Sequence, residues 1–420
     1  MSKTVPEGWA IHPLNDKVDI LSGFPFKSSL FCDDPSKMGI IRIRDLAKQS
    51  VETFYAGDFD DAYVIRKGDI LVGMDGDFNI VKWKTKSALL NQRICKVKAS
   101  RSGGFDSDFL FYSLVDDLDS IHSATGATTV KHLSVKDIKG IEKAYPPLSE
   151  QKKIAAILSS VDEVIEKTRA QIDKLKDLKT GMMQELLTKG IGSGGVPHTE
   201  FKDSSVGKIP VSWESYLLGD VFDLKNGVNK DKDAFGHGVP IISYKNVYVG
   251  GGILDSDLGA LVEMNEKELS RFRVHFGDVF FTRTSETPDE IGFSNVYLGR
   301  RDDVVFNGFV IRARQKNDLF HPHFLKYVFQ SNAVRKQMMD NSKFTTRAGI
   351  SGESLGRIAI AVPDIPEQKN IANALDSVEA RITKTINKIN TIQSFKKAMM
   401  QDLLTGKVRV NVNSRELSNV

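Results

Sequence analysis

The chain has 420 residues, 40% of them hydrophobic and 27% charged, with a formal net charge of +4 at neutral pH. This length exceeds one ordinary domain and predicts two to four compact units of a soluble globular protein. With no apolar run long enough to span a bilayer and no signal-peptide core, the sequence excludes a membrane protein and predicts a cytoplasmic location. Its two cysteines, Cys32 and Cys95, exclude a disulfide framework and a cysteine-rich zinc site.

The charge is unevenly distributed along the chain. Residues 1–145 contain 20 basic and 20 acidic side chains and are neutral overall. Residues 78–101, however, hold seven basic and no acidic side chains, and residues 312–347 hold eight basic and two acidic ones. We therefore expect any polyanion to be bound by local patches, because the overall charge is too small to attract one.

Residues 1–145 are predicted to form a β-rich globular domain. Short alternating runs such as "NIVKWKTK" and "NQRICKVK" are separated by Gly and Asp, a pattern typical of strands joined by turns.

Residues 146–190 and 363–410 are each predicted to form a long helix. Apolar residues recur in alternating steps of four and three, and this spacing keeps one apolar seam facing a partner helix in a coiled coil. Thr168 and Thr385 interrupt the two seams at matching positions, where a polar residue can fix the register. The predicted seam consists of Ile154, Leu158, Val161, Ile165, Ile172 and Leu175 in the first helix and of Ile371, Leu375, Val378, Ile382, Ile389 and Ile392 in the second.

The two predicted helices are copies of one sequence. "EQKKIAAIL" in the first recurs as "EQKNIANAL" in the second, and 20 of 43 positions are identical between residues 146–188 and 363–405. Gly190 and Gly406 follow the two copies and suit helix C-caps. Near-identical seams of equal length favour packing of the helices on each other over the alternative of two unrelated core helices.

Residues 191–362 are predicted to hold a linker and a second β-rich domain that echoes the first. The stretch "GIGSGGVPHTE" is glycine-rich and polar, as linkers are. Trp9 and Trp213 occupy matching positions in the two domains, and "KGDILVG" parallels "FGDVFFT". The predicted fold class is therefore α+β: two β-rich domains separated by two long helices that pack as an antiparallel coiled coil, with a pseudo-two-fold internal repeat.

This arrangement suggests a function by geometry. The backbone of B-DNA is two-fold symmetric, so two similar domains related by a pseudo-two-fold axis could read two half-sites at a spacing fixed by the helices. At about 1.5 Å per residue, a helix of roughly 40 residues is about 60 Å long. Since the two domains differ between their matched positions, the two half-sites are expected to differ as well.

The chain resembles the specificity subunit of type I restriction–modification systems, the phage-defence complexes, along essentially its whole length. The resemblance is carried by two P-x-(L/I)-x-E-Q-K-x-I-A-x-x-L segments at residues 146–158 and 363–375, each closing on "MMQ(E/D)LLT", and by a domain before each. It implies that 1–145 and 191–362 contain target-recognition domains that read the two parts of a split double-stranded DNA sequence. It also implies that the helices dock two modification subunits, through which two restriction subunits join.

The resemblance further implies that this chain is not itself an enzyme. S-adenosylmethionine would be bound by the methyltransferase partner, and ATP and Mg by the nuclease-motor partner. The residues agree, because the chain lacks both an (N/D)-P-P-aromatic motif and a Walker-type GxxxxGK(S/T) motif. His321 and His323 are neighbours without a third ligand nearby, so neither a metal site nor a catalytic site is predicted.

Several residues are candidate DNA contacts in the first domain. Lys82, Lys84 and Lys86 alternate, so on a strand their ammonium groups would share one face and suit phosphates; an ordinary solvated strand face is the alternative. Arg42 and Arg44 would share a strand face by the same period, and their forked ends suit bidentate contacts to guanine. Structural roles remain an alternative for these arginines.

The second domain offers Tyr244, Lys245 and Asn246 at the place that corresponds to Arg42 and Arg44. An Asn side chain suits a bidentate contact to adenine, so the exchange fits two different half-sites. Arg93, Lys131, Arg283 and Arg347 complete the set of candidate DNA contacts.

Two other functions remain open at this point. One is a coiled-coil protein-interaction scaffold without DNA specificity. The other is an enzyme, either a fused methyltransferase or a nuclease, although acid-then-lysine combinations such as Glu263 with Lys267 are expected by chance in a chain with 54 acidic and 58 basic residues.

Overall fold

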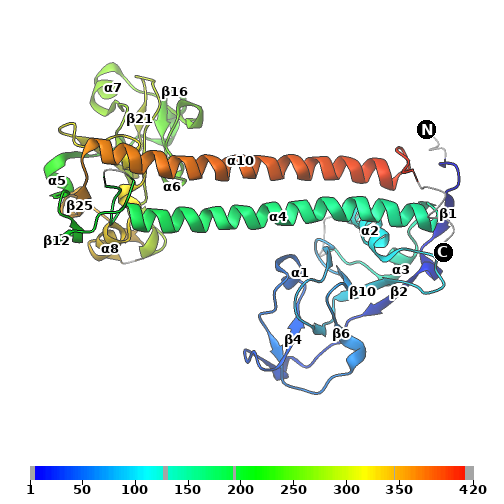
Figure 1. Ribbon diagram of the computed structural model, residues 1–420. Coiled ribbons are helices and arrows are strands. Elements are labelled where there is room, and N and C mark those ends of the chain that lie inside the picture. The colour runs from blue at the N-terminus through cyan, green and yellow to red at the C-terminus, as the bar shows by residue number, and fades with distance from the viewer. Residues whose placement is uncertain (1–4, 126–130, 193–194, 345, 412–420) are drawn as a thin grey trace. The chain divides into compact units, whose positions relative to one another are not determined.

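A computed structural model describes residues 5–125, 131–192, 195–344 and 346–411 of the protein (Figure 1). The chain divides into two compact units, of which unit 1 is residues 1–169 with 387–420 and unit 2 is residues 170–386. Each unit holds one α+β domain and part of two long helices, α4 (Leu148–Leu186) and α10 (Ile365–Leu404). We call the part of unit 1 that precedes α4 domain 1, and the part of unit 2 between α4 and α10 domain 2. Residues 193 and 194 of the predicted linker lie outside the described residues.

Domain 1 is built on two main sheets. One is antiparallel with the strand order β2-β10-β7-β8, and the other is mixed with the order β3-β5-β4-β9-β6. The first and last strands, β1 and β11, pair with each other and bring the two ends of the domain together. The strands are β1 (Ala10–Pro13), β2 (Val18–Ser22), β3 (Phe31–Cys32), β4 (Met38–Ile41), β5 (Phe54–Tyr55), β6 (Val64–Ile65), β7 (Ile70–Gly73), β8 (Ile80–Lys82), β9 (Ala88–Leu90), β10 (Ile94–Ala99) and β11 (Glu142–Tyr145).

Three helices accompany these sheets, and the longest, α2, packs its apolar face on the antiparallel sheet and on α4. Its N-terminus is capped by Asp106, whose carboxylate accepts hydrogen bonds from the backbone N–H groups of Asp108 and Phe109 at 3.0 and 2.9 Å. The helices are α1 (Asp45–Lys48), α2 (Ser107–Ala124) and α3 (Val135–Lys139).

Domain 2 repeats this plan. Its antiparallel sheet has the order β15-β22-β18-β20, and its first and last strands, β14 and β25, also pair. The strands are β12 (Phe201–Ser204), β13 (Gly207–Pro210), β14 (Glu214–Leu217), β15 (Phe222–Asn226), β16 (Phe235–Ile242), β17 (Leu261–Val262), β18 (Val279–Thr282), β19 (Thr284–Ser285), β20 (Ser294–Val296), β21 (Val305–Phe306), β22 (Val310–Gln315), β23 (Lys343–Phe344), β24 (Ala348–Gly349) and β25 (Ala359–Val362). The helices are α5 (Leu218–Val221), α6 (Tyr244–Tyr248), α7 (Glu266–Phe272), α8 (Asn332–Asp340) and α9 (Gly352–Gly356).

The register of the antiparallel sheets makes the two domains comparable residue by residue. In domain 1 the central strand begins with Ile94 opposite Gly73, and in domain 2 it begins with Val310 opposite Thr282. In both domains a parallel pair lies beside this sheet, β4 with β9 in domain 1 and β16 with β21 in domain 2. The faint similarity between the two domain sequences therefore reflects one shared scaffold.

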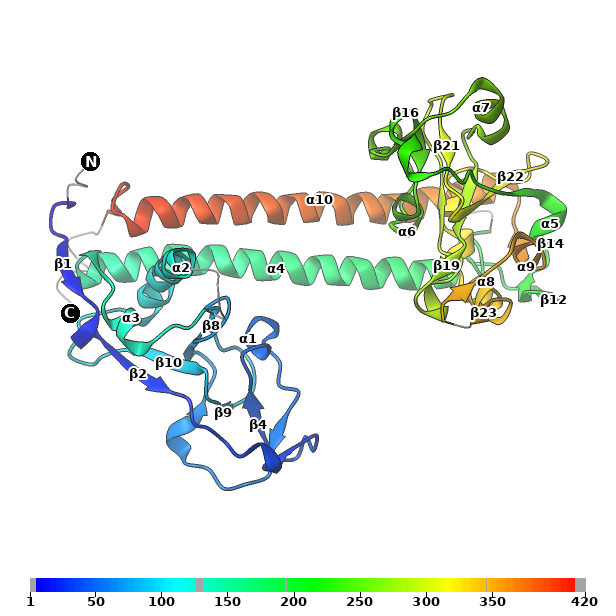
Figure 2. The same cartoon turned by 180° about the vertical axis from the view of Figure 1, so that it is seen from behind.

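Within each unit, α4 and α10 lie side by side and run antiparallel (Figures 1 and 2). In unit 1, Asp162 of α4 is paired with Lys396 of α10 at 2.7 Å. In unit 2, Lys179 of α4 is paired with Glu379 of α10 at 2.9 Å. The predicted fold class, two α+β domains with two long antiparallel helices in an internal repeat, is confirmed.

The predicted seam residues differ in burial. Val161, Ile382 and Ile392 are half-buried and the other nine are buried. The hydroxyl of Thr168 donates to the carbonyl of Val164, and that of Thr385 donates to the carbonyl of Arg381. Each threonine thus satisfies its hydroxyl within its own helix.

Each helix pair contributes to the core of its own unit. In unit 1, Leu158 and Leu403 join the cluster between α2 and the antiparallel sheet, and in unit 2, Leu375 and Leu187 join the corresponding cluster. Among the described residues, no helix is both long enough and apolar enough to cross a membrane.

Candidate nucleic-acid interface

A buried Trp–Glu contact holds the start of domain 1 against α4. The indole Nε1 of Trp9 donates to Glu150 Oε2 at 3.1 Å. Arg409, beyond the end of α10, donates to both carboxylate oxygens of Glu150 at 2.8 and 2.9 Å. Gly406 adopts φ +69°, and a Cβ atom there would lie 2.5 Å from Pro6 and 3.1 Å from Trp9. The glycine that was predicted as a C-cap therefore also makes room for the domain.

Unit 2 repeats this contact with other partners. Trp213 Nε1 donates to Glu367 Oε2 at 3.0 Å. The second oxygen of Glu367 accepts from the backbone N–H of Ile191 at 2.7 Å and lies 3.0 Å from His198 Nε2. Gly190 adopts φ +67°, and a Cβ atom there would clash with Trp213, so the glycine again leaves room for the tryptophan. The matched tryptophans and the glutamates of the repeated "EQK" segments thus connect each domain to a helix, and we call such a connection a joint.

A second joint lies further along the helices, and in unit 1 it is centred on Tyr112 of α2. The Tyr112 hydroxyl donates to Asp162 Oδ2 at 2.7 Å and lies 3.2 Å from the hydroxyl of Ser159. Lys396 pairs with Asp162 and lies over the Tyr112 ring, 5.2 Å from its centroid. Burial raises the pKa of Tyr112, and the neighbouring Asp162 adds to this shift.

In unit 2 the same joint is centred on Tyr327, which lies between the short 3₁₀ helices η7 (Phe324–Lys326) and η8 (Val328–Gln330). Its hydroxyl contacts Asp376 and Glu379 at 2.5 and 2.7 Å. Lys326 also contacts both carboxylates, at 2.8 and 3.0 Å. Burial opposes the ionisation of both carboxylates. Hydrogen bonds from Lys326 and Tyr327 nevertheless lower the pKa of Asp376, and hydrogen bonds from Lys179 and Tyr327 lower the pKa of Glu379.

The end of the antiparallel sheet in domain 1 carries a group of polar side chains that we call rim 1: Asp75, Arg93, Lys131 and His132. Arg93 and His132 are exposed, and Asp75 and Lys131 are half-buried. Arg93 and His132 both pair with the carboxylate of Asp75, the histidine at 2.6 Å. The hydrogen bond from His132 lowers the pKa of Asp75, and Arg93 lowers it further, although burial opposes both. Lys131 donates to the backbone carbonyl of His122. Two of the predicted DNA contacts, Arg93 and Lys131, are therefore brought together here.

The corresponding end of the sheet in domain 2 is rim 2: Arg283, Thr284, Glu286, Phe309 and Arg347. Arg283 is exposed, and Arg347 pairs with Glu286 at 2.8 Å. Thr284, Glu286, Phe309 and Arg347, together with the stacked rings of Tyr244 and Tyr248, border a hollow of about 450 Å³. Burial raises the pKa of Tyr244, and Glu290 and Glu286 add to that shift. Rim 2 thus holds two further predicted contacts, Arg283 and Arg347, and a third, Tyr244, borders the same hollow as Arg347.

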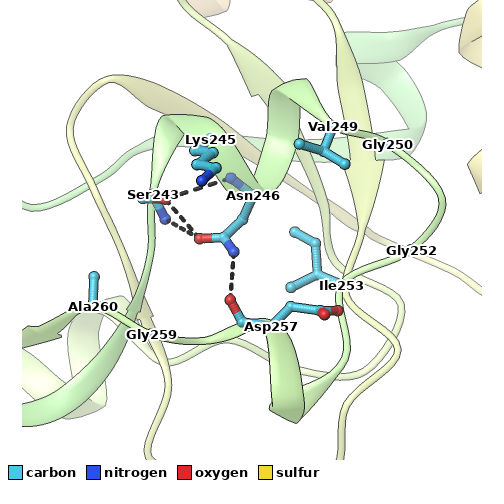
Figure 3. A pocket seen from close by; sticks show the side chains of 10 residues that line it. All are labelled: Ser243, Lys245, Asn246, Val249, Gly250, Gly252, Ile253, Asp257, Gly259 and Ala260. Atoms are coloured by element: carbon cyan, nitrogen blue, oxygen red, sulfur yellow. Dashed lines mark hydrogen bonds between the residues drawn. The ribbon is translucent and has the colours of Figure 1, made fainter. Parts of the chain in front are cut away.

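Helix α6 separates this hollow from a second one of about 500 Å³ (Figure 3). Lys245 is exposed beside it. The Asn246 side chain accepts from the Ser243 backbone at 2.9 Å and donates to the Asp257 carbonyl at 2.8 Å, as Figure 3 shows. Asn246 therefore uses its amide to fold the loop around α6, and Lys245 is the more accessible of the two predicted contacts.

The expected shared strand face of Lys82, Lys84 and Lys86 is wrong, because β8 ends at Lys82. Trp83 is buried, and its indole donates to the carbonyl of Lys86 at 2.8 Å, which turns the chain away from the sheet. Lys82 pairs with Asp108 at 2.5 Å, and Lys84 pairs with Glu166 of α4. Of the three, Lys86 is exposed and has no ion pair within the described part of the chain.

The expected strand face of Arg42 and Arg44 is also wrong, because β4 ends at Ile41. The buried carboxylate of Asp45 accepts from the backbone N–H of Arg42 at 2.9 Å and starts the turn into α1. Arg44 is mostly exposed, whereas the Arg42 side chain is largely covered. Asn246 performs the same capping role in domain 2 that Asp45 performs in domain 1.

The basic run predicted at 312–347 is partly internal. Arg312 is buried and pairs with Asp223 at 2.8 Å, and Arg314 pairs with Asp278 at 2.6 Å. Its surface charge is therefore smaller than the sequence suggests.

Comparison with known proteins adds to this geometry. A family model described as the type I restriction modification DNA specificity domain matches residues 6–177 and again residues 210–393. The chain belongs to the type I restriction–modification DNA specificity family. The two matches fall on the two halves of the internal repeat, so the chain carries two copies of the DNA specificity domain.

Relatives and solved structures agree with this family. The chain is 26% identical to the EcoBI specificity subunit of Escherichia coli over 93% of this chain and 84% of the relative. It is 27% identical to the MjaVIII specificity subunit of Methanocaldococcus jannaschii over 97% and 95%. In structure it is similar to the specificity subunit from M. genitalium, with a TM-score of 0.53 at 14% identity and coverage of 94% and 96%. A structure from a study of type I complex assembly matches with a TM-score of 0.55 at 16% identity, covering 97% of this chain and 100% of the other.

Some residues of this DNA specificity protein were missed by sequence reasoning. Asp75, His132 and Phe309 join the rims only through the sheet register, and Tyr112 and Tyr327 join their helices only through tertiary contacts. The sequence contained a signal for Phe309, because "NQRIC" and "NGFVI" are corresponding segments of the two domains and align Phe309 with Arg93.

Proposed function

We propose that this chain is the specificity subunit of a type I restriction–modification complex and reads a split DNA target, one half-site per domain. The observation that carries the proposal is that one sheet scaffold occurs twice and presents different side chains at the same end, rim 1 and rim 2. A shared scaffold with divergent rims suits two different half-sites. The scaffold positions the domain on the DNA, and the contacts to bases determine which sequence is bound.

Phosphate contacts in this proposal come from exposed cations. Lys86, Arg44, Lys245 and Arg283 are exposed, and cations of this kind supply salt-dependent affinity. Among the other candidates, Arg42, Lys82 and Asn246 are held in internal contacts and act mainly by shaping the surface, whereas Lys84 is exposed but paired with Glu166.

The helices set the spacer between the half-sites in this proposal. Inserting four residues, about one helical turn, into both helices should lengthen them by roughly 6 Å and change the preferred spacer while leaving both half-sites unchanged. If the protein with lengthened helices selects a motif whose spacer is unchanged, the helices do not set the spacer.

The helices also dock two modification subunits in this proposal. Leu178 of α4 and Phe395 of α10 occupy the same position of the internal repeat, and both are large apolar side chains exposed on their helices. Two equivalent positions suit two copies of one partner, the modification subunit, which would bind S-adenosylmethionine. A further motor subunit, joined through this partner, would bind ATP and Mg. Leu178→Glu and Phe395→Glu should each weaken capture of one modification subunit, whereas the exposed Phe276→Glu in domain 2 should not.

Selection of duplexes from a random DNA library by the purified complex of this chain with its modification subunit tests the proposal. Enrichment of two sequence blocks separated by a fixed unspecified gap supports it. Retention of all duplexes alike, with normal capture of the modification subunit, would instead support the alternative of a protein-interaction scaffold.

A further inference from the structure

Arg93 in domain 1 and Phe309 in domain 2 occupy the same backbone position. Each immediately precedes the first residue of the central strand, Ile94 in β10 and Val310 in β22. The Arg93 carbonyl accepts from the backbone N–H of Met74 at 2.7 Å, and the Phe309 carbonyl accepts from that of Arg283 at 3.1 Å. The two side chains therefore leave equivalent points of the two sheets.

Both side chains point away from the core. The Arg93 side chain is 66% exposed and Phe309 is 63% exposed. Arg93 also has a φ of +70°, a conformation that costs a non-glycine residue about 1 kcal/mol or more. An exposed phenylalanine and an arginine in a conformation that favours glycine thus occupy one equivalent position of the two domains.

The surroundings of the two positions differ in chemistry. In domain 1, Asp75 holds the guanidinium of Arg93 and also binds His132. In domain 2 the bridge between the same two segments pairs Thr284 with Gly349, so these ionic partners have no counterpart.

The hollow beside Phe309 is lined by aromatic and charged side chains. Tyr244 and Tyr248 supply aromatic walls, Arg347 is paired with Glu286, and Glu290 accepts a hydrogen bond from Tyr248. With one arginine and two glutamates the lining carries a net negative charge, which disfavours phosphate, whereas an aromatic edge accepts the neutral methyl group of a base. The aromatic side of the hollow therefore suits a base edge.

Building on the proposed function, we propose that this shared position determines the difference between the half-sites. Arg93 reads a guanine edge, and Phe309 contacts a thymine methyl group. Asp75 fixes one side of the guanidinium and leaves other N–H donors free for the O6 and N7 acceptors of guanine. Phe309 has no polar atom and can discriminate thymine only through its methyl group.

Modified bases test this directly, once library selection has defined the two half-sites. Replacing the relevant thymine of one half-site by deoxyuridine removes only the methyl group. This change should weaken binding of the wild-type complex roughly threefold and should leave the Phe309→Ala complex unaffected. Phe276→Ala is the matched control, because Phe276 is also exposed but precedes the other end of β18, so its complex should keep the wild-type sensitivity.

The other half-site is tested with 7-deazaguanine, which lacks the N7 acceptor. Wild-type binding should fall about tenfold, whereas Arg93→Gly, a substitution that suits the positive φ, should bind both duplexes equally. Arg66→Gly, at an exposed position before the other end of β7, is the matched control.

The outcomes separate this inference from the proposed function. If the selected motif is split but Phe309→Ala and Arg93→Gly keep the wild-type sensitivity to both modified bases, the inference is overturned and the proposed function stands. The inference is also overturned if either half-site lacks the base assigned to it. If no motif is selected at all, the proposed function itself fails.

Discussion

The joints between domain and helices in the two units occupy the same place and differ in charge. In unit 1, Tyr112 meets one carboxylate, Asp162, and the hydroxyl of Ser159. In unit 2, Tyr327 meets two carboxylates and the nearly buried ammonium group of Lys326. The tyrosine, one carboxylate and the lysine from the other helix are common to both joints.

This difference shows which part of the joint the fold requires. The three shared groups tie a domain to both helices at once, so they set where the domain is attached. The extra charges of unit 2 add contacts between domain 2 and α10, because Asp376 is also contacted by His323 and Lys326. Because buried charges are costly unless fully paired, they make the unit 2 joint more sensitive to loss of any one partner.

The largest effect is expected at the Trp–Glu contacts. Glu367→Ala should destabilise unit 2 by about 3 kcal/mol, because it leaves the indole of Trp213 and the backbone N–H of Ile191 without an acceptor. Glu150→Ala should destabilise unit 1 by about 2 kcal/mol, since Arg409 is partly exposed and can turn to water. Urea denaturation followed by hydrogen exchange of peptides from each unit measures both values. Equal losses would contradict the stated difference.

The next effect compares the tyrosines. Tyr327→Phe should destabilise unit 2 by about 2 kcal/mol, because two half-buried carboxylates lose a shared donor. Tyr112→Phe should cost unit 1 about 1 kcal/mol, because Lys396 still pairs with Asp162. The same exchange experiment reports the order of the two losses, and a larger loss in unit 1 would reverse the comparison.

Acid should act on unit 2 through the same charges. The pKa values of Asp376 and Glu379 are lowered from their ordinary values of 3.8 and 4.5. Both carboxylates therefore contribute stability above those values and lose it as the pH falls through their lower folded pKa values. Asp376→Ser, which copies Ser159 of unit 1, should reduce the loss of unit 2 stability below pH 3.8. Circular dichroism against pH measures this, and an unchanged acid transition would argue against the joint as its cause.

The smallest effect on stability is expected for the exposed cations. Lys86→Ala in domain 1 and Lys245→Ala in domain 2 should each change the free energy of unfolding by less than about 0.5 kcal/mol. Each should lower the salt dependence of DNA binding by about one unit of slope if it contacts a phosphate. Titrations of one duplex at several salt concentrations give the slopes, and unchanged slopes would remove both residues from the interface.

The sequence predicted the parts of the fold that depend on local pattern and repetition. The heptad spacing and the doubled "EQK" segments predicted two matched helices, and Gly190 and Gly406 were recognised as caps because a left-handed residue ends a helix in this way. The matched Trp9 and Trp213 pointed to a common scaffold. The spacing of residues along the chain is enough to predict these features.

The predicted strand faces failed where distant residues decide the local structure. Lys82 and Lys84 pair with Asp108 and Glu166, which lie far away in the sequence. The run around Arg42 reads as a continued strand, but the buried Asp45 caps a turn there instead. Period-two patterns cannot distinguish a strand from a capped turn when the deciding contact is tertiary.

If two domains on one chain read two halves of one target, methylation of the host DNA depends on this chain in a characteristic way. Methylome sequencing of the host with and without the chain measures this dependence. We expect a methylated motif of two specified blocks, separated by a gap of fixed length, that disappears when the chain is removed. A methylome that is unchanged, or a lost motif that is one uninterrupted block, would contradict it.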